Sequence, residues 1–246
     1  MKTNTKNWTA KPENEKKVNP GATKIHNLMI VDESGSMFSL YLAAISGMNE
    51  TLESIRTLAS ECPQQAQEVT LVTFDSSRYN KIFDSVPAAE TREITRHDYR
   101  PNACTPLYDA MGKALTELEP NVKEKEAVVV TVITDGYENA SCEFSLRDIR
   151  ALVERLEKQG WIFTYIGANQ VSATVGASMG IKDTMDFIAN PDEMKKMWMR
   201  KNLSNRKFVQ ESRHADFDAC CYERGNFFGP ESEWDEEEEK QDNNNK

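Results

Sequence analysis

The sequence lacks the marks of membrane, secreted and zinc-binding proteins. None of its apolar runs approaches the roughly 18 residues of a membrane-spanning helix, and no apolar segment follows the basic N-terminus as in a secretion signal. The five cysteines are odd in number, scattered and without a Cys-x-x-Cys pair, and the three histidines are dispersed. These absences argue against a disulfide framework and a zinc site, and they favour a soluble, cytoplasmic protein with free thiols.

Basic residues are also fewer than acidic ones. The 246 residues include 30 Lys and Arg against 40 Asp and Glu, a formal net charge of −10, which argues against a general nucleic-acid binder. The charge is uneven, because residues 1–24 are basic whereas residues 231–246 are strongly acidic. We expect a disordered arm over 1–24, a domain over 25–207, and a C-terminal extension over 208–246 that ends in a solvated acidic tail.

Apolar runs of strand length alternate along the chain with segments in which apolar residues recur every three or four positions. This alternation predicts an α/β fold with a doubly wound, Rossmann-like and mostly parallel six-stranded sheet, covered by helices on both faces. The segment 80–86 is short and polar, which is typical of an edge strand. The expected strands cover 24–31, 68–74, 80–86, 127–134, 161–167 and 184–188, and the expected helices cover 39–59, 106–118, 145–158, 170–178 and a segment after Pro191.

Oxygen-bearing side chains follow the predicted strands. Asp32, Ser34 and Ser36 come at the end of the first strand, Asp135 follows the strand 127–134, and Thr105 precedes a helix. Alternate residues of an extended segment point the same way, and ligands of such sheets collect at the carboxyl ends of strands, so we expect these side chains to converge. Ligation by oxygen alone suits Mg²⁺ or Mn²⁺ and does not suit zinc or copper. With only two formal negative charges around it, the ion would stay electrophilic and accept a carboxylate from outside.

The set Asp32-x-Ser34-x-Ser36, Thr105 and Asp135 followed by glycine resembles the metal-ion-dependent adhesion site of von Willebrand factor A-type domains, over roughly residues 24–205. The resemblance implies a Rossmann-like sheet with one antiparallel edge strand. It also implies that Ser34, Ser36 and Thr105 bind the metal directly and that the two aspartates bind it directly or through water.

Three further segments, 104–110, 134–141 and 165–170, resemble bacterial and phage single-domain members of this family. Family members usually carry glycine before the threonine, whereas Ala103-Cys104 stand here, which indicates a stiffer loop. The resemblance implies a non-enzymatic adhesion or accessory module. Such a module would capture an acidic side chain of a partner protein through the bound cation, with specificity from the loops 76–104 and 137–144.

Other interpretations of the same residues remain open. Asp32 could be the nucleophile of a metal-dependent phosphatase or phosphotransferase, with Glu33 or Glu138 as a base, although such enzymes of the haloacid dehalogenase type need a second aspartate where Ser34 stands. Thr105 before a proline is also typical of a helix N-cap. The metal site could be vestigial on an intact scaffold. In a last alternative, the acids of the tail would enter the site of a neighbouring copy.

Overall fold

The computed structural model describes residues 21–169, 171–214, 217–219, 222 and 225–230. The expected arm, apart from residues 21–24, and the expected acidic tail therefore lie outside the described residues. Within the described part of the chain, no helix combines the length and the apolar character needed to cross a membrane.

A six-stranded sheet of order β3-β2-β1-β4-β5-β6 forms the centre of the molecule. β2 and β3 pair antiparallel at one edge, and every other neighbouring pair is parallel. The prediction of a doubly wound, mostly parallel sheet with one antiparallel edge strand is confirmed. The strands are β1 (Lys24–Asp32), β2 (Ala66–Asp75), β3 (Arg78–Pro87), β4 (Glu126–Thr134), β5 (Trp161–Ala168) and β6 (Asp183–Phe187).

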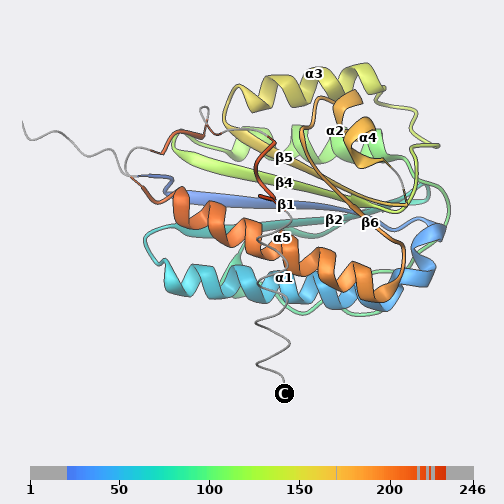
Figure 1. Ribbon diagram of the computed structural model, residues 1–246, viewed down its shortest axis with the longest axis horizontal. Coiled ribbons are helices and arrows are strands. Elements are labelled where there is room, and N and C mark those ends of the chain that lie inside the picture. Colours follow the sequence, from blue (N-terminus) through green and yellow to red (C-terminus); the bar gives the residue numbers. More distant parts are fainter. Residues whose placement is uncertain (1–20, 170, 215–216, 220–221, 223–224, 231–246) are drawn as a thin grey trace, which may run out of the picture.

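Helices cover both faces of the sheet (Figure 1). On one face lie α1 (Tyr41–Glu61) and α5 (Pro191–Glu211), which pack against each other. On the other lie α2 (Leu107–Leu118), α3 (Leu146–Glu157) and α4 (Ser172–Ser178). The short 3-10 helix η1 (Gly35–Leu40) leads from β1 into α1.

β1 shows why a nearly continuous apolar run becomes a central strand. Its side chains alternate between two cores, with Met29 and Val31 packing on the side of α1 and α5, and Leu28 and Ile30 on the side of α2 and α3. All four are buried, as expected of a parallel strand with helices on both faces. Packing on both faces fixes the carboxyl end of β1 and, with it, the position of the residues that follow the strand.

The C-terminal boundary of the domain lies beyond the expected position. Residue 207 falls inside α5, which continues to Glu211. Phe208, Phe227 and Phe228 are buried and belong to the core on the side of α1 and α5. The described part of the expected extension is therefore packed against the domain.

Gly47 allows the close approach of α1 and α5. A Cβ atom at this position would lie 2.0–2.3 Å from the indole of Trp198, whose side chain is fully buried. Since real Cβ contacts do not reach such distances, the glycine is required by packing rather than by backbone conformation.

We expect Gly47→Ala to lower the free energy of unfolding by up to about 2 kcal/mol, as measured by chemical denaturation. Alanine in a helix interior ordinarily stabilises by about 1 kcal/mol over glycine, but overpacking against a buried ring costs about 1–3 kcal/mol and outweighs it. The exposed neighbour Ser46→Ala is the control and should change stability by less than about 0.5 kcal/mol. A Gly47→Ala protein more stable than the parent would contradict this account of the helix contact.

Candidate functional site: a cluster of oxygens at the carboxyl edge of the sheet

The site lies where the strand order reverses. β1 and β4 are neighbours, and the connection that leaves β1 leads to β2 on one side, whereas the connection that leaves β4 leads to β5 on the other. Asp32 is the last residue of β1, and Asp135 follows β4 directly. Because Val31 is in register with Ile133, the two strands end side by side. Crevices at such reversal points are the usual ligand sites of open α/β sheets.

The residues after β1 meet the residue after β4. The hydroxyl of Ser36 donates a hydrogen bond of 2.5 Å to Oδ1 of Asp135, 99 residues later in the chain. The hydroxyl oxygens of Ser34 and Ser36 are 3.1 Å apart. The structure thus brings three of the five candidate residues into one chain of short contacts.

The other two candidates converge beside Gly136. A Cβ atom on this glycine would lie 3.3 Å from Oγ1 of Thr105, 3.6 Å from Oγ of Ser36 and 4.0 Å from Oδ2 of Asp32. Three oxygens from two distant segments of the chain therefore lie within 4.0 Å of one point. Every one of the five candidate residues contributes to this oxygen cluster.

Burial makes the charged forms of both carboxylates in the cluster less favourable than they are in water. Burial raises the pKa of Asp32 to about 6, although hydrogen bonds from the Thr134 hydroxyl and the Ser34 amide favour its charged form and the nearby charge of Asp135 opposes it. Burial also raises the pKa of Asp135. Within the described ranges, neither aspartate forms an ion pair with a lysine, arginine or histidine side chain. A cation would relieve this cost.

The donor set fits a small hard cation better than a transition metal. An octahedral Mg²⁺ with ligands at about 2.1 Å has neighbouring ligand oxygens about 3.0 Å apart, close to the 3.1 Å between Ser34 and Ser36. No group of three or more His, Cys, Asp or Glu side chains suited to a metal occurs among the described residues. The oxygen cluster depends instead on hydroxyls, which disfavours zinc and copper.

Thr105 is not the helix cap that its sequence context indicates. α2 begins at Leu107, its N-cap residue is Pro106, and no side chain caps it, so the capping interpretation is wrong. The backbone of Thr105 pairs with Asn139 instead. Its amide donates to Oδ1 of Asn139 over 2.8 Å, and its carbonyl accepts from the Asn139 amide over 3.1 Å. The Thr105 hydroxyl therefore remains available at the cluster.

The segment before Thr105 is bound to the end of β1. Ala103 has φ +57°, in the left-handed region that favours glycine, and its carbonyl accepts from the Gly35 amide over 3.0 Å. The Tyr99 hydroxyl donates to the carbonyl of Asp32 over 2.7 Å. An alanine rarely adopts this conformation, so the backbone of Ala103 is strained; the stiffness expected of this loop stays a prediction.

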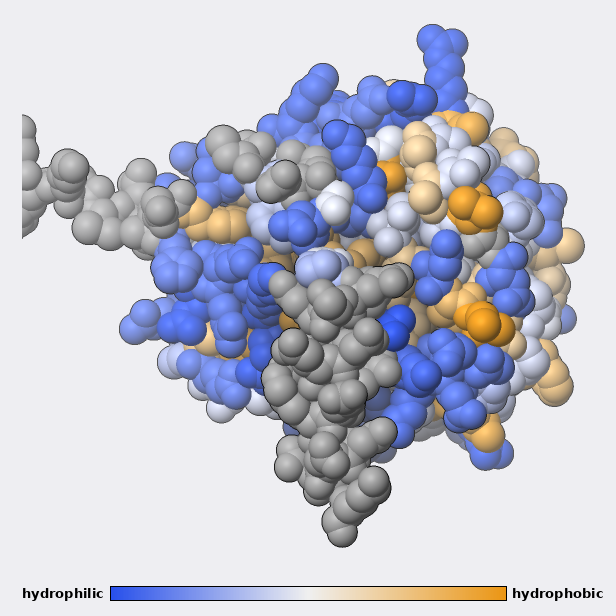
Figure 2. Space-filling model, in the orientation of Figure 1, coloured by the Kyte–Doolittle hydropathy of each residue, from blue (hydrophilic) through white to orange (hydrophobic). Residues whose placement is uncertain are grey.

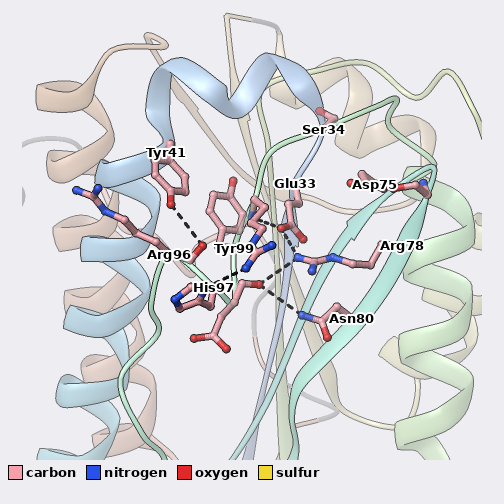
Figure 3. Close-up of polar contacts among 12 residues, drawn as sticks. Glu33, Ser34, Tyr41, Asp75, Arg78, Asn80, Arg96, His97 and Tyr99 are labelled. Carbon is pink, nitrogen blue, oxygen red and sulfur yellow. Dashed lines mark hydrogen bonds and ion pairs between the residues drawn. The ribbon is translucent and has the colours of Figure 1, made fainter.

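Glu33 has a structural role behind the oxygen cluster (Figure 3). Its side chain is fully buried and accepts hydrogen bonds from the Arg78 guanidinium and the Arg100 amide. Arg78 extends from β3 and also donates to the carbonyl of Asp98 over 3.1 Å. This ion pair joins the end of β1, the edge strand and the loop before Thr105.

Glu138 likewise holds a loop in place. Its carboxylate accepts from the amide of Tyr108 at the start of α2 and from the amides of Ala140 and Ser141. The roles of Arg78, Tyr99, Thr134 and Asn139 are the ones that sequence reasoning missed. Thr134 and Asn139 lie inside the segment 134–141 already singled out, but Arg78 and Tyr99 carry no local signal.

No family model matches the sequence, and no curated protein matches it. Solved structures do. The vWF domain of the type V pili tip protein Mfa5 from Porphyromonas gingivalis matches with TM-score 0.57 and 10% identity, over 80% of this chain and 99% of that one. The VWA domain of SpRpn10 matches with TM-score 0.51 and 12% identity, over 72% and 94%.

Proximal thread matrix protein 1 from the mussel byssus also matches, with TM-score 0.51 and 15% identity over 78% of this chain. The match spans only about half of that protein, 47% of its length. At these identities the likeness concerns the fold alone. The chain has the von Willebrand factor A-type fold, with the oxygen cluster at the carboxyl edge of its sheet.

We expect Asn139→Ala to lower the free energy of unfolding by about 1–3 kcal/mol, because it leaves the buried amide of Thr105 without an acceptor. Asn139→Asp keeps an oxygen at that position and should recover part of the loss. Denaturant titrations of the three proteins measure the effect. Equal stability of Asn139→Ala and the parent would show that the Thr105 pairing contributes nothing.

Proposed function

We propose that the chain is a metal-ion-dependent protein-binding module. Mg²⁺ or Mn²⁺ would be held by Ser34, Ser36 and Thr105, with Asp32 and Asp135 acting directly or through water. A partner protein would contribute an aspartate or glutamate to complete the coordination. This is the arrangement of a metal-ion-dependent adhesion site, of the kind found in bacterial and phage single-domain proteins.

One observation carries the proposal. Oxygens of Asp32, Ser36 and Thr105 lie within 4.0 Å of one point, and Ser36 bonds Asp135 beside it. The hydroxyls add no charge, so two carboxylates would leave a divalent ion with little excess negative charge around it. An ion in that state attracts a further carboxylate, which is the chemistry of acid capture.

A binding role is better supported than a phosphatase role. Asp32 has no exposed surface, whereas a nucleophile has to be reached by the substrate that it attacks. Glu33 and Glu138, the candidate bases, already accept hydrogen bonds that fix loops. Metal-dependent hydrolysis of p-nitrophenyl phosphate that is lost in Asp32→Asn would favour the phosphatase instead.

The proposed location is a reducing compartment such as the cytoplasm. Cys62, Cys104 and Cys142 are free thiols, two of them exposed. Exposed free cysteines persist where thiols are kept reduced.

We expect Asp32→Ala and Asp135→Ala each to weaken Mg²⁺ or Mn²⁺ binding about tenfold or more, because each removes a negative charge from the cluster. Thr105→Val, which removes an oxygen at nearly constant shape, should weaken binding with no change of charge. Isothermal titration calorimetry measures the affinities, and circular dichroism verifies the fold.

Asp84→Ala is the matched control, since Asp84 is an exposed aspartate on β3 that pairs with Lys81. Its metal affinity should equal that of the parent. Variants of Asp32 and Asp135 that bind as tightly as the parent would overturn the assignment. A parent protein that binds neither ion would identify a vestigial site.

A further inference from the structure

The large hydrophobic side chains that stay exposed gather at one edge of the sheet. Among the described residues, six are exposed, and five of them are more than half accessible. These five lie in the segments that follow β1, β4, β5 and β6. We call them the apolar rim: Phe38, Leu42, Tyr137, Val171 and Ile188.

Topology places the apolar rim at the same edge of the sheet as the oxygen cluster. β1, β4, β5 and β6 are adjacent and parallel, so their carboxyl ends share one edge. Phe38 comes two residues after Ser36, and Tyr137 comes two residues after Asp135. Figure 2 shows strongly hydrophobic side chains toward the right, where the strands of Figure 1 have their carboxyl ends.

The opposite edge of the sheet has a different character. At the start of β1, Lys24 pairs with Glu68 over 2.6 Å, and His26 contacts Glu126 over 2.8 Å. None of the six exposed hydrophobic side chains lies there. Single exposed hydrophobic residues need no explanation, but their confinement to the loops of one edge is typical of an interaction surface.

Two arginines add positive charge beside the apolar rim. Arg96 and Arg100 are exposed, and within the described residues neither forms an ion pair with an acid. The carbonyl of Arg96 accepts from the hydroxyl of Tyr41, next to Leu42 (Figure 3). The segment 90–100 as a whole is balanced, with three arginines and three acids, but these two guanidinium groups can pair with acidic groups of a partner at this edge.

We propose that the apolar rim makes the site selective for a carboxylate that is flanked by large apolar side chains on a partner protein. This selectivity rests on the proposed function, because the metal would take the carboxylate while the apolar rim takes its neighbours. A metal-bound carboxylate alone cannot distinguish among the acids of many proteins. Contacts between the apolar rim and the side chains that flank the carboxylate would make this distinction.

The test uses two capped seven-residue peptides with a central glutamate, one with leucine and the other with serine on both sides of it. Calorimetry in Mg²⁺ should show the leucine peptide binding about tenfold more tightly, the gain expected from roughly 60 Å² of additional buried apolar surface. In a Phe38→Ser/Tyr137→Ser protein, the ratio should fall below about threefold while the serine peptide keeps its affinity. Val122→Ser, at the opposite edge, is the control and should leave the ratio unchanged.

The outcomes separate the two proposals. If both peptides bind equally and EDTA abolishes the binding, the selectivity is wrong and carboxylate capture stands. The same holds if the leucine peptide still binds tenfold more tightly in the double variant, because the apolar rim is then not the source of the preference. No binding of either peptide overturns carboxylate capture itself, and the selectivity with it.

A peptide of residues 230–240, which carries Trp234 beside Asp235, provides a third arm of the experiment. If it binds more tightly than the leucine peptide, the occupant is a second copy of this chain and the assignment to a different partner is wrong.

Discussion

A buried carboxylate without a basic partner is the constraint on which the site depends. Asp32 ends the central strand, where helices on both faces exclude water. Hydrogen bonds to a charged group contribute about 1.5–3 kcal/mol each, and Asp32 accepts from Thr134 and from the Ser34 amide. Its pKa is nevertheless raised to about 6, so the cost of burial outweighs these bonds. The fold thus holds an unfavourable charge at the place where a cation would make it favourable, which supports the proposed metal site.

The neighbouring acid shows how the same strand end treats two carboxylates differently. Glu33 is as deeply buried as Asp32, but it is neutralised by Arg78 and accepts from the Arg100 amide. Consecutive residues of a strand point to opposite sides, so one acid faces the cluster and the other faces the edge strand. Loss of Arg78, whose side chain is partly exposed, would leave the buried Glu33 carboxylate without its cation, so the Glu33–Arg78 pair supports the loop before Thr105.

The sequence predicted the fold well because its strands are buried on both faces and therefore appear as short apolar runs. The edge position of β3 followed from its polarity. The convergence of Asp32 and Asp135 could be expected from the rule for strand ends, whereas Thr105 precedes a helix and follows no parallel strand directly; the structure brings all three together. Whether they bind metal remains a prediction.

What the sequence could not reveal are the long-range partners. Arg78 is 45 residues from Glu33, and no local pattern indicates that they pair. The capping interpretation of Thr105 is wrong, although a threonine before proline is a common cap, because the helix begins one residue later, at Leu107, and the Thr105 backbone pairs with Asn139. The end of the domain was placed too early because Phe227 and Phe228 lie in a polar stretch without periodicity, and only their burial reveals them as core.

The oxygen cluster and the apolar rim complement each other in physical terms. Coordination is directional and strong but recognises a group present on nearly every protein surface, whereas apolar contact is non-directional and grows with the area removed from water. Neither alone gives both a defined geometry and a choice of partner. The loops after β1 and β4 carry both kinds of residue within a few positions, Ser36 with Phe38 and Asp135 with Tyr137. A shift of the backbone in either loop would therefore alter the oxygen cluster and the apolar rim together. The loops after β5 and β6 carry Val171 and Ile188 of the apolar rim but none of the five candidate ligands, so changes there would affect apolar contact alone.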